Sequence, residues 1–113
     1  MPNLVVNQKA VNYIKQQIEQ GNVNTSEGNW DENKPQPAQG DAYLAAHSYA
    51  DYGNWFLAED TDANPDTKER YSFPVGNFKQ VFRSGLIAAE QRAGQYHHED
   101  IKAAAHMLRE MIK

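Results

Sequence analysis

The chain has 113 residues, 40 % of them hydrophobic, and a formal net charge of −4. This length suffices for one domain with its own core but not for two, so we predict a single domain over residues 1–113. The sequence has no cysteine, which excludes disulfides, thiolate metal sites and a cysteine nucleophile; it also lacks an apolar run long enough for a transmembrane helix, so we expect no membrane partner.

Charge is unevenly distributed along the chain. Residues 1–66 carry three Lys against ten Asp or Glu, whereas residues 67–113 carry eight Lys or Arg against five Asp or Glu. Two such halves can attract each other within one fold or between copies, and the basic half can meet an acidic partner. A single folded unit with mixed surface charge is the simplest interpretation.

The N-terminal third predicts one helix and one long loop. Residues 5–20 carry apolar side chains at three-to-four spacing, which indicates an amphipathic helix capped by Asn7 or Asn3. Residues 21–40 are rich in Gly, Asn, Pro and Ser, and two prolines there argue against regular helix. Trp30 either anchors this loop to the body or presents its ring to a partner. Anchoring is favoured because large aromatic side chains are more often buried.

The middle of the chain predicts a helix and then an extended piece. Helical spacing of apolar residues favours a continuous or lightly kinked helix over residues 41–58, and a shorter helix over 41–51 that breaks near Gly53 is the alternative. Residues 59–69 are typical of an acidic turn. Residues 70–76 alternate large apolar with small or polar side chains, and their proline limits them to an edge or isolated strand.

The C-terminal part predicts a helical hairpin. Residues 78–93, with Asn77 as the cap, and residues 98–112 both carry one apolar face, and the connection between them is short. No second convincing strand accompanies residues 70–76. The predicted fold class is therefore mainly α: a small helical domain with a C-terminal helical hairpin, a long N-terminal loop and at most one short extended segment.

Three segments in the second half of the chain carry a family resemblance. They read Trp-x-Leu-x-x-Asp from Trp55 to Asp60, Lys-x-x-Tyr-x-x-Pro-x-Gly from Lys68 to Gly76, and Val-x-Arg-x-Gly-Leu-x-Ala-Ala from Val81 to Ala89. In order and spacing they resemble a small module of phage and prophage proteins that has no assigned chemistry. The resemblance implies a viral or mobile-element setting and a structural or accessory role. It carries over no catalytic residue.

Oxygen-bearing side chains alternate along the acidic turn, at Asp60, Asp62, Asn64 and Asp66. Calcium prefers such ligands, and the spacing matches the first part of an EF-hand loop. The match then fails, because Pro65 stands where the loop needs Gly and Tyr71 stands where it needs Glu. An acidic turn whose side chains bond to backbone donors is the favoured interpretation. A looser calcium site is the lesser alternative, and no other cofactor is predicted.

A basic stripe is predicted on the last helix, at Lys102, His106, Arg109 and Lys113. Residues at this spacing share one helix face, and such a face can contact phosphates or an acidic protein. No helix-turn-helix, zinc finger or aromatic nucleic-acid signature accompanies the stripe, and the whole chain is acidic. A solvated helix face is therefore favoured over an interaction surface.

These observations favour an interaction module over an enzyme. The sequence has no nucleophile elbow, no phosphate-binding loop and no pairing of acid and base groups that indicates catalysis. We predict a small phage- or prophage-related structural or accessory protein that binds a protein of phage or host, in the host cytoplasm or on the virion. The alternative is a nucleic-acid-associated accessory protein that uses the basic stripe.

Overall fold

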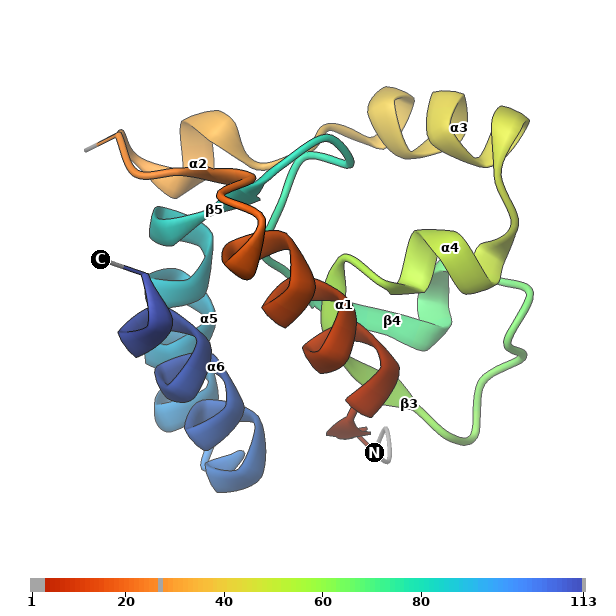
Figure 1. The fold of residues 1–113 in the computed structure, drawn as a ribbon. Helices are drawn as coiled ribbons and strands as arrows, with labels where there is room; N and C mark the ends of the chain where they lie inside the picture. Colours follow the sequence, from red (N-terminus) through yellow and green to blue (C-terminus); the bar gives the residue numbers. More distant parts are fainter. Residues whose placement is uncertain (1–3, 27, 113) are drawn as a thin grey trace.

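The computed structural model describes residues 4–26 and 28–112, which form a mixed α/β fold with two small sheets (Figure 1). The helices are α1 (Gln8–Glu19), α2 (Trp30–Asn33), α3 (Pro37–Ala46), α4 (Tyr49–Gly53), the 3₁₀ turn η1 (Lys68–Arg70), α5 (Arg83–Gln95) and α6 (Glu99–Met111). The strands are β1 (Leu4–Val6), β2 (Val23–Asn24), β3 (Phe56–Asp60), β4 (Tyr71–Pro74) and β5 (Val81–Phe82). The prediction of a mainly α domain with at most one extended segment is wrong, because strands from five parts of the chain pair.

The larger sheet has the order β1-β3-β4 and is antiparallel throughout, with Leu4 opposite Asp60 and Phe56 opposite Pro74. The smaller sheet pairs β2 with β5 in parallel, and Val23 lies opposite Val81. The extended piece expected over 70–76 contains β4, which is an edge strand paired with β3, so the first of the two expected alternatives, an edge strand, is correct.

The helix predicted over residues 41–58 is wrong in its second half. Helix α3 ends at Ala46, the side chain of Ser48 accepts a hydrogen bond from the Asp51 amide at 3.1 Å and begins α4, and β3 follows. The first three residues of β3 are all buried, with β1 on one side and β4 on the other. A short apolar run fits a buried helix or a buried strand equally well by periodicity, and pairing on both edges decides for the strand.

The loop predicted over residues 21–40 contains regular structure. It holds β2, α2 and the start of α3, whose first residue is Pro37. Proline is tolerated at the first helical position because the amide of that residue has no partner within the helix. Gln36 and Gln39 form a capping box, in which the side chain of each accepts a hydrogen bond from the backbone amide of the other.

The turn before β5 replaces the predicted start of the long helix. Asn77 was expected to cap a helix beginning at residue 78, but its Oδ1 accepts hydrogen bonds from the amides of Lys79 and Gln80, at 3.0 and 2.9 Å. This bonding closes a tight turn in which Phe78 has φ of +68°. Helix α5 therefore begins only at Arg83, after β5.

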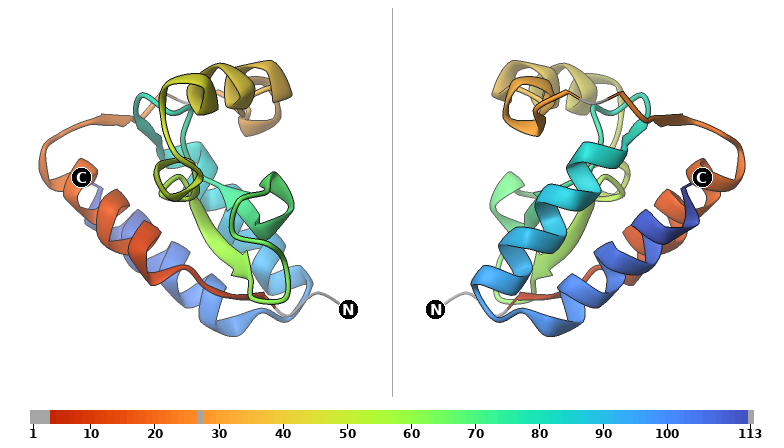
Figure 2. Two further views of the ribbon diagram at one scale, coloured as in Figure 1. Left: turned by 90° about the vertical axis from the view of Figure 1, so that its right-hand side faces the viewer. Right: turned by 90° about the vertical axis from the view of Figure 1, so that its left-hand side faces the viewer.

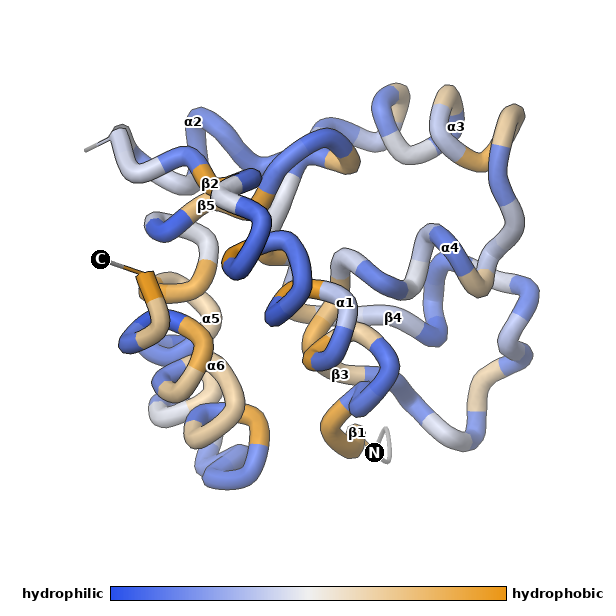
Figure 3. Tube along the Cα trace, viewed as in Figure 1, coloured by the Kyte–Doolittle hydropathy of each residue, from blue (hydrophilic) through white to orange (hydrophobic). Residues whose placement is uncertain are grey.

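The core lies where α1, α5 and α6 cover the sheet. Its fully buried side chains include Ile14 of α1, Leu57 of β3, Leu86 of α5 and Leu108 of α6. Figure 2 shows α5 and α6 as an antiparallel hairpin with α1 beside α6, and α3 standing apart from this body. Hydrophobic positions gather in α6 and β1, whereas α2 and the β3–β4 connection are mostly hydrophilic (Figure 3).

The segments that carry the family resemblance build this core. Trp55 and Leu86 are 2 % and 0 % exposed. At Gly76 an added Cβ would lie 2.4 Å from the Trp55 ring, and at Gly85 it would lie 3.1 Å from the backbone of Val75. These glycines allow β4, β5 and α5 to approach one another closely, so much of the pattern specifies packing.

Candidate functional site

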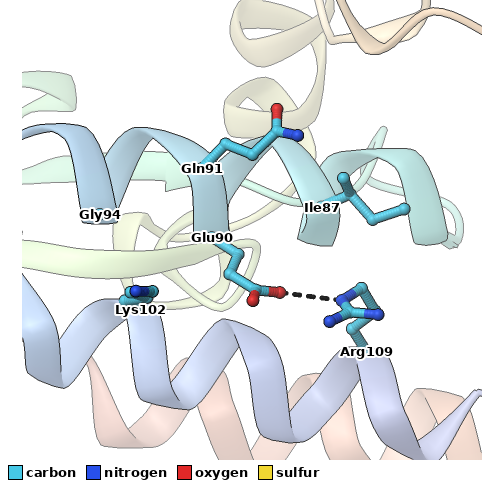
Figure 4. Close-up of a pocket in the computed structure, with 6 residues that line it drawn as sticks. All are labelled: Ile87, Glu90, Gln91, Gly94, Lys102 and Arg109. Carbon is cyan, nitrogen blue, oxygen red and sulfur yellow. Dashed lines mark hydrogen bonds and ion pairs between the residues drawn. The ribbon is translucent and has the colours of Figure 1, made fainter.

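The basic stripe of α6 is largely engaged with carboxylates. Arg109 Nε donates to Glu90 Oε1 at 2.8 Å (Figure 4), and His106 Nδ1 lies 3.0 Å from Glu90 Oε2. Glu110 lies within 4 Å of the Arg109 and His106 side chains. The hydrogen bond from Arg109, assisted by His106, holds the pKa of the Glu90 carboxyl below its ordinary value. The stripe therefore joins α6 to α5, and its predicted last member, Lys113, lies outside the described residues.

A shallow groove of about 370 Å³ lies along this helix pair, lined by Ile87, Glu90, Gln91, Gly94, Lys102 and Arg109. Of the stripe residues that the structure describes, Lys102 is the one without a carboxylate within 4 Å. A single exposed ammonium group is a small electrostatic footprint for a phosphate backbone.

The acidic turn is held by its own backbone. Asp60 Oδ1 accepts from the Asp62 amide and Asn64 Oδ1 accepts from the Asp66 amide, each at 2.9 Å. Arg70 closes the turn from the other side by donating to the Ala63 carbonyl at 2.8 Å. Within residues 4–26 and 28–112, no three His, Asp or Glu side chains lie close enough together to hold a metal ion. Of the four predicted ligands, Asp60 and Asn64 thus use their side chains to hold the turn, whereas Asp62 and Asp66 contribute their backbone amides.

Trp30 is an anchor in the structure. Trp30 is only 9 % exposed. Its ring lies 5.6 Å from the ring of Phe82 and over Gly85 of α5. Burial of this ring fixes α2 against α5. The same burial leaves little of the ring for a partner.

A row of stacked rings is the most distinctive feature outside the core. His47 stacks on Tyr43 at 4.0 Å, Tyr43 on Phe78 at 4.8 Å, and Phe78 on Tyr52 at 5.4 Å, with interplanar angles of 11°, 24° and 22°. Tyr52, at the inner end of the row, is buried. Burial raises the pKa of its hydroxyl above the ordinary value, so this side chain stays neutral. The outer end is open, since the His47 side chain is 44 % exposed.

Phe78 connects the row to the body at a conformational cost. A positive φ is unusual for a bulky side chain and costs about 1–2 kcal/mol. Its ring also lies 6.2 Å from the rings of both Trp55 and Phe56. Strained residues that persist because their surroundings fix them are concentrated at functional sites.

The ring row forms part of a cleft between α3 and the Asn77–Lys79 turn, which we call the α3 cleft. Its volume is about 440 Å³. Its lining residues are Gln39, Ala42, Tyr43, Ala46 and His47 from α3, and Asn77, Phe78 and Lys79 from the turn. A second cleft, of about 220 Å³, also reaches Phe78. An aromatic surface with a few polar groups on its walls can bind a flat or extended apolar segment.

The α3 cleft was not predicted from the sequence. Its two walls are separated in the chain by the whole segment between His47 and Asn77, and the first of them includes a segment interpreted as loop. The only local signal was the i, i+4 spacing of Tyr43 and His47, which places two rings on one face of a helix.

Comparison with known proteins returns no match: no protein-family model, no curated protein and no solved structure matches this chain. The resemblance to a phage module therefore stays a prediction. Among the described residues no helix combines the length and the apolar character that crossing a membrane requires.

Proposed function

We propose that this protein is a small phage- or prophage-related structural or accessory protein that acts by binding a protein of phage or host. The setting rests on the three resembling segments between Trp55 and Ala89. The mode of action rests on one observation, the α3 cleft, where Tyr43 of α3 and Phe78 of the turn form an aromatic surface. Aromatic side chains in such positions contribute much of the binding energy at protein interfaces. The proposal assigns the protein no enzymatic activity and no cofactor.

The arrangement of α3 supports this proposal. Of its residues only Gly40 is buried, so the helix contributes little to the core. Lys68 Nζ bonds to Asp41 Oδ1 and so ties α3 to η1. A helix that is held in place but scarcely buried leaves most of its side chains available to a partner.

The alternative, a nucleic-acid-associated protein, has less support. It depends on the α6 stripe, where Arg109 and His106 already contact Glu90. A phosphate group binding there would have to compete with the Glu90 carboxylate. The affinity for nucleic acid would also fall steeply as the salt concentration rises.

A capture experiment tests the proposal. Tagged wild-type protein, the Ala42→Trp variant and the Ala103→Trp variant are incubated with lysate of phage-infected host cells, with and without nuclease. Both alanines are exposed on helices, but only Ala42 lines the α3 cleft, so the two substitutions are matched. We expect a protein partner that survives nuclease, is retained by Ala103→Trp and is lost with Ala42→Trp.

Two outcomes contradict the proposal. Capture of nucleic acid alone, abolished by nuclease and by salt, would favour the α6 stripe instead. A protein partner that both tryptophan variants retain equally would remove the α3 cleft from the function while leaving an interaction role elsewhere on the surface.

A further inference from the structure

We propose that the α3 cleft binds a proline-rich segment of the partner in the extended polyproline II conformation. This inference rests on the proposed function and names the chemistry that its site recognises. Three observations carry it: the orientation of two side-chain amides, the aromatic row between them, and a proline-bearing stretch of this chain on the neighbouring cleft.

The cleft walls present hydrogen-bond donors. Gln39 Oε1 accepts from the Gln36 amide at 2.7 Å, and Asn77 Oδ1 accepts from the amides of Lys79 and Gln80. Because each oxygen is engaged by backbone, the NH₂ group of each side chain is the part left to donate. Lys79 adds an ammonium group, which can only donate.

Proline-rich chains are complementary to such a surface. Each proline offers a carbonyl acceptor and no N–H, so a proline-rich segment places no unsatisfied donor opposite Gln39, Asn77 or Lys79. The polyproline II helix has no internal hydrogen bonds, so its carbonyls are free to accept. Its pyrrolidine rings are apolar and pack on aromatic side chains, as in other proline-recognising grooves. A segment with ordinary amides would leave its N–H groups facing donors.

A stretch of this chain with such geometry lines the second cleft together with Phe78. Lys34 and Gln36 have φ, ψ of −62°, 148° and −81°, 159°, which are polyproline II values, and each precedes a proline. Pro35 and Pro37 line this cleft, and the rings of Tyr52, Phe56 and Phe78 line it with them. Extended proline-bearing backbone and aromatic rings thus line one cleft together, and the α3 cleft presents the Phe78 ring in another.

The test is a titration of ¹⁵N-labelled full-length protein with acetylated, amidated decaproline, followed by NMR. A decapeptide of alternating Gly and Ser is the control peptide, because it is extended and flexible but carries N–H groups and no rings. We expect decaproline to shift the side-chain NH₂ signals of Gln39 and Asn77 and the amides of residues 42–47 and 77–79. The control peptide should bind at least about tenfold more weakly, the loss expected for one or two hydrogen bonds and their packing.

Isosteric variants test the role of the amides. Gln39→Glu and Asn77→Asp keep the oxygen that accepts from backbone and remove the NH₂ donors, so the fold should persist while decaproline affinity falls about tenfold each. Gln91→Glu makes the same chemical change in the α5–α6 groove and should leave the affinity unchanged. Amide spectra of each variant without peptide report whether the fold is intact.

The inference is overturned by any of three results. Decaproline shifts no cleft signal, or the Gly-Ser peptide binds equally well, or both isosteric variants bind decaproline like wild type. A single-stranded oligonucleotide that shifts the same signals at lower concentration would assign the rings to base stacking and also overturn it. A partner lost with Ala42→Trp together with a negative decaproline titration would refute this inference alone and leave the proposed function standing.

Discussion

At the scale of single residues, Gly76 shows how closely the chain packs around Trp55. A Cβ at this position would lie 2.4 Å from Trp55 Cε3 and 2.7 Å from the Gln80 carbonyl oxygen, and neither the buried indole nor the turn backbone has room to move. We expect Gly76→Ala to lower the free energy of unfolding by about 1–3 kcal/mol, measured by urea denaturation.

Gly94→Ala is the matched control. A Cβ at Gly94 would make ordinary contact, at 3.4 Å, with the flexible side chain of Lys102. The free energy of unfolding should therefore not fall, and it should rise by up to about 1 kcal/mol because Ala is the better helix former. Equal effects of the two substitutions would show that close packing at Trp55 is not what restricts position 76.

Phe78 gives a second prediction, which concerns whether its Gly or its Ala variant has the higher free energy of unfolding. Phe78→Ala removes the ring but keeps a Cβ at φ of +68°, whereas Phe78→Gly removes the ring and also relieves the backbone. Both variants should be less stable than wild type, with Phe78→Gly more stable than Phe78→Ala by about 1 kcal/mol in urea denaturation. Gly usually destabilises a protein more than Ala does. A Phe78→Gly variant less stable than Phe78→Ala would therefore contradict a strained native backbone at this turn.

At the scale of elements, the contact between α5 and α6 makes stability depend on pH. The hydrogen bond from Arg109, with a contribution from His106, lowers the pKa of Glu90 in the folded state below its ordinary value. A lowered folded pKa means that the unfolded chain binds the proton more readily as pH falls. The stabilisation is therefore complete above the ordinary carboxyl pKa and is lost as pH falls through the folded-state pKa.

Glu90→Gln tests this linkage. The variant should be less stable than wild type at pH 7, and the difference between the two should shrink as pH falls below the ordinary carboxyl range, measured by urea denaturation at each pH. Glu19→Gln, which removes an exposed carboxylate at the end of α1, is the control and should track wild type throughout. A difference between Glu90→Gln and wild type that stays constant down to pH 2 would contradict the assignment.

At the scale of the whole molecule, the acidic and basic parts of the chain meet within the fold. Asp41 bonds to Lys68, and Glu59 Oε1 accepts from Arg70 at 2.6 Å, so both pairs join residues 1–66 to residues 67–113. The two tryptophans likewise belong to one body, Trp55 in the core and Trp30 over Gly85.

Unfolding should therefore be cooperative across the two tryptophans. Trp30→Phe leaves Trp55 as the fluorescent reporter, and Trp55→Phe leaves Trp30. In each variant the urea midpoint from fluorescence should coincide with the midpoint from circular dichroism of the same variant, as two-state unfolding requires. A lower fluorescence midpoint when Trp30 reports alone would mean that the α2 segment detaches before the body unfolds.

Much of the fold could be predicted where the structure is local. The amphipathic faces of α1 and α6 are visible in the sequence because a helix repeats every 3.6 residues, and Asn7 caps α1 as predicted. Strand β3 could not be predicted in this way. Its buried residues have no polar alternation, and one of its partners, β1, lies far away in the chain.

The same distinction applies to the sites. The chemistry of Asp60 to Asp66 could be weighed from spacing alone, because Asp and Asn side chains bond to backbone two residues on. The carboxylate partners of Arg109 and His106 were missed, because Glu90 comes from another helix. The α3 cleft was missed for the same reason.

The sequence by itself therefore determined the faces of α1 and α6, the Asn7 cap and the acidic turn, and the absence of cysteine chemistry, since these depend on composition or on neighbours within a few residues. Tertiary structure alone decided the sheet pairings, the neutralisation of the basic stripe and the meeting of Tyr43 with Phe78. Those features depend on long-range contacts between segments, and the burial and close packing that select such contacts have no periodic signature in the chain.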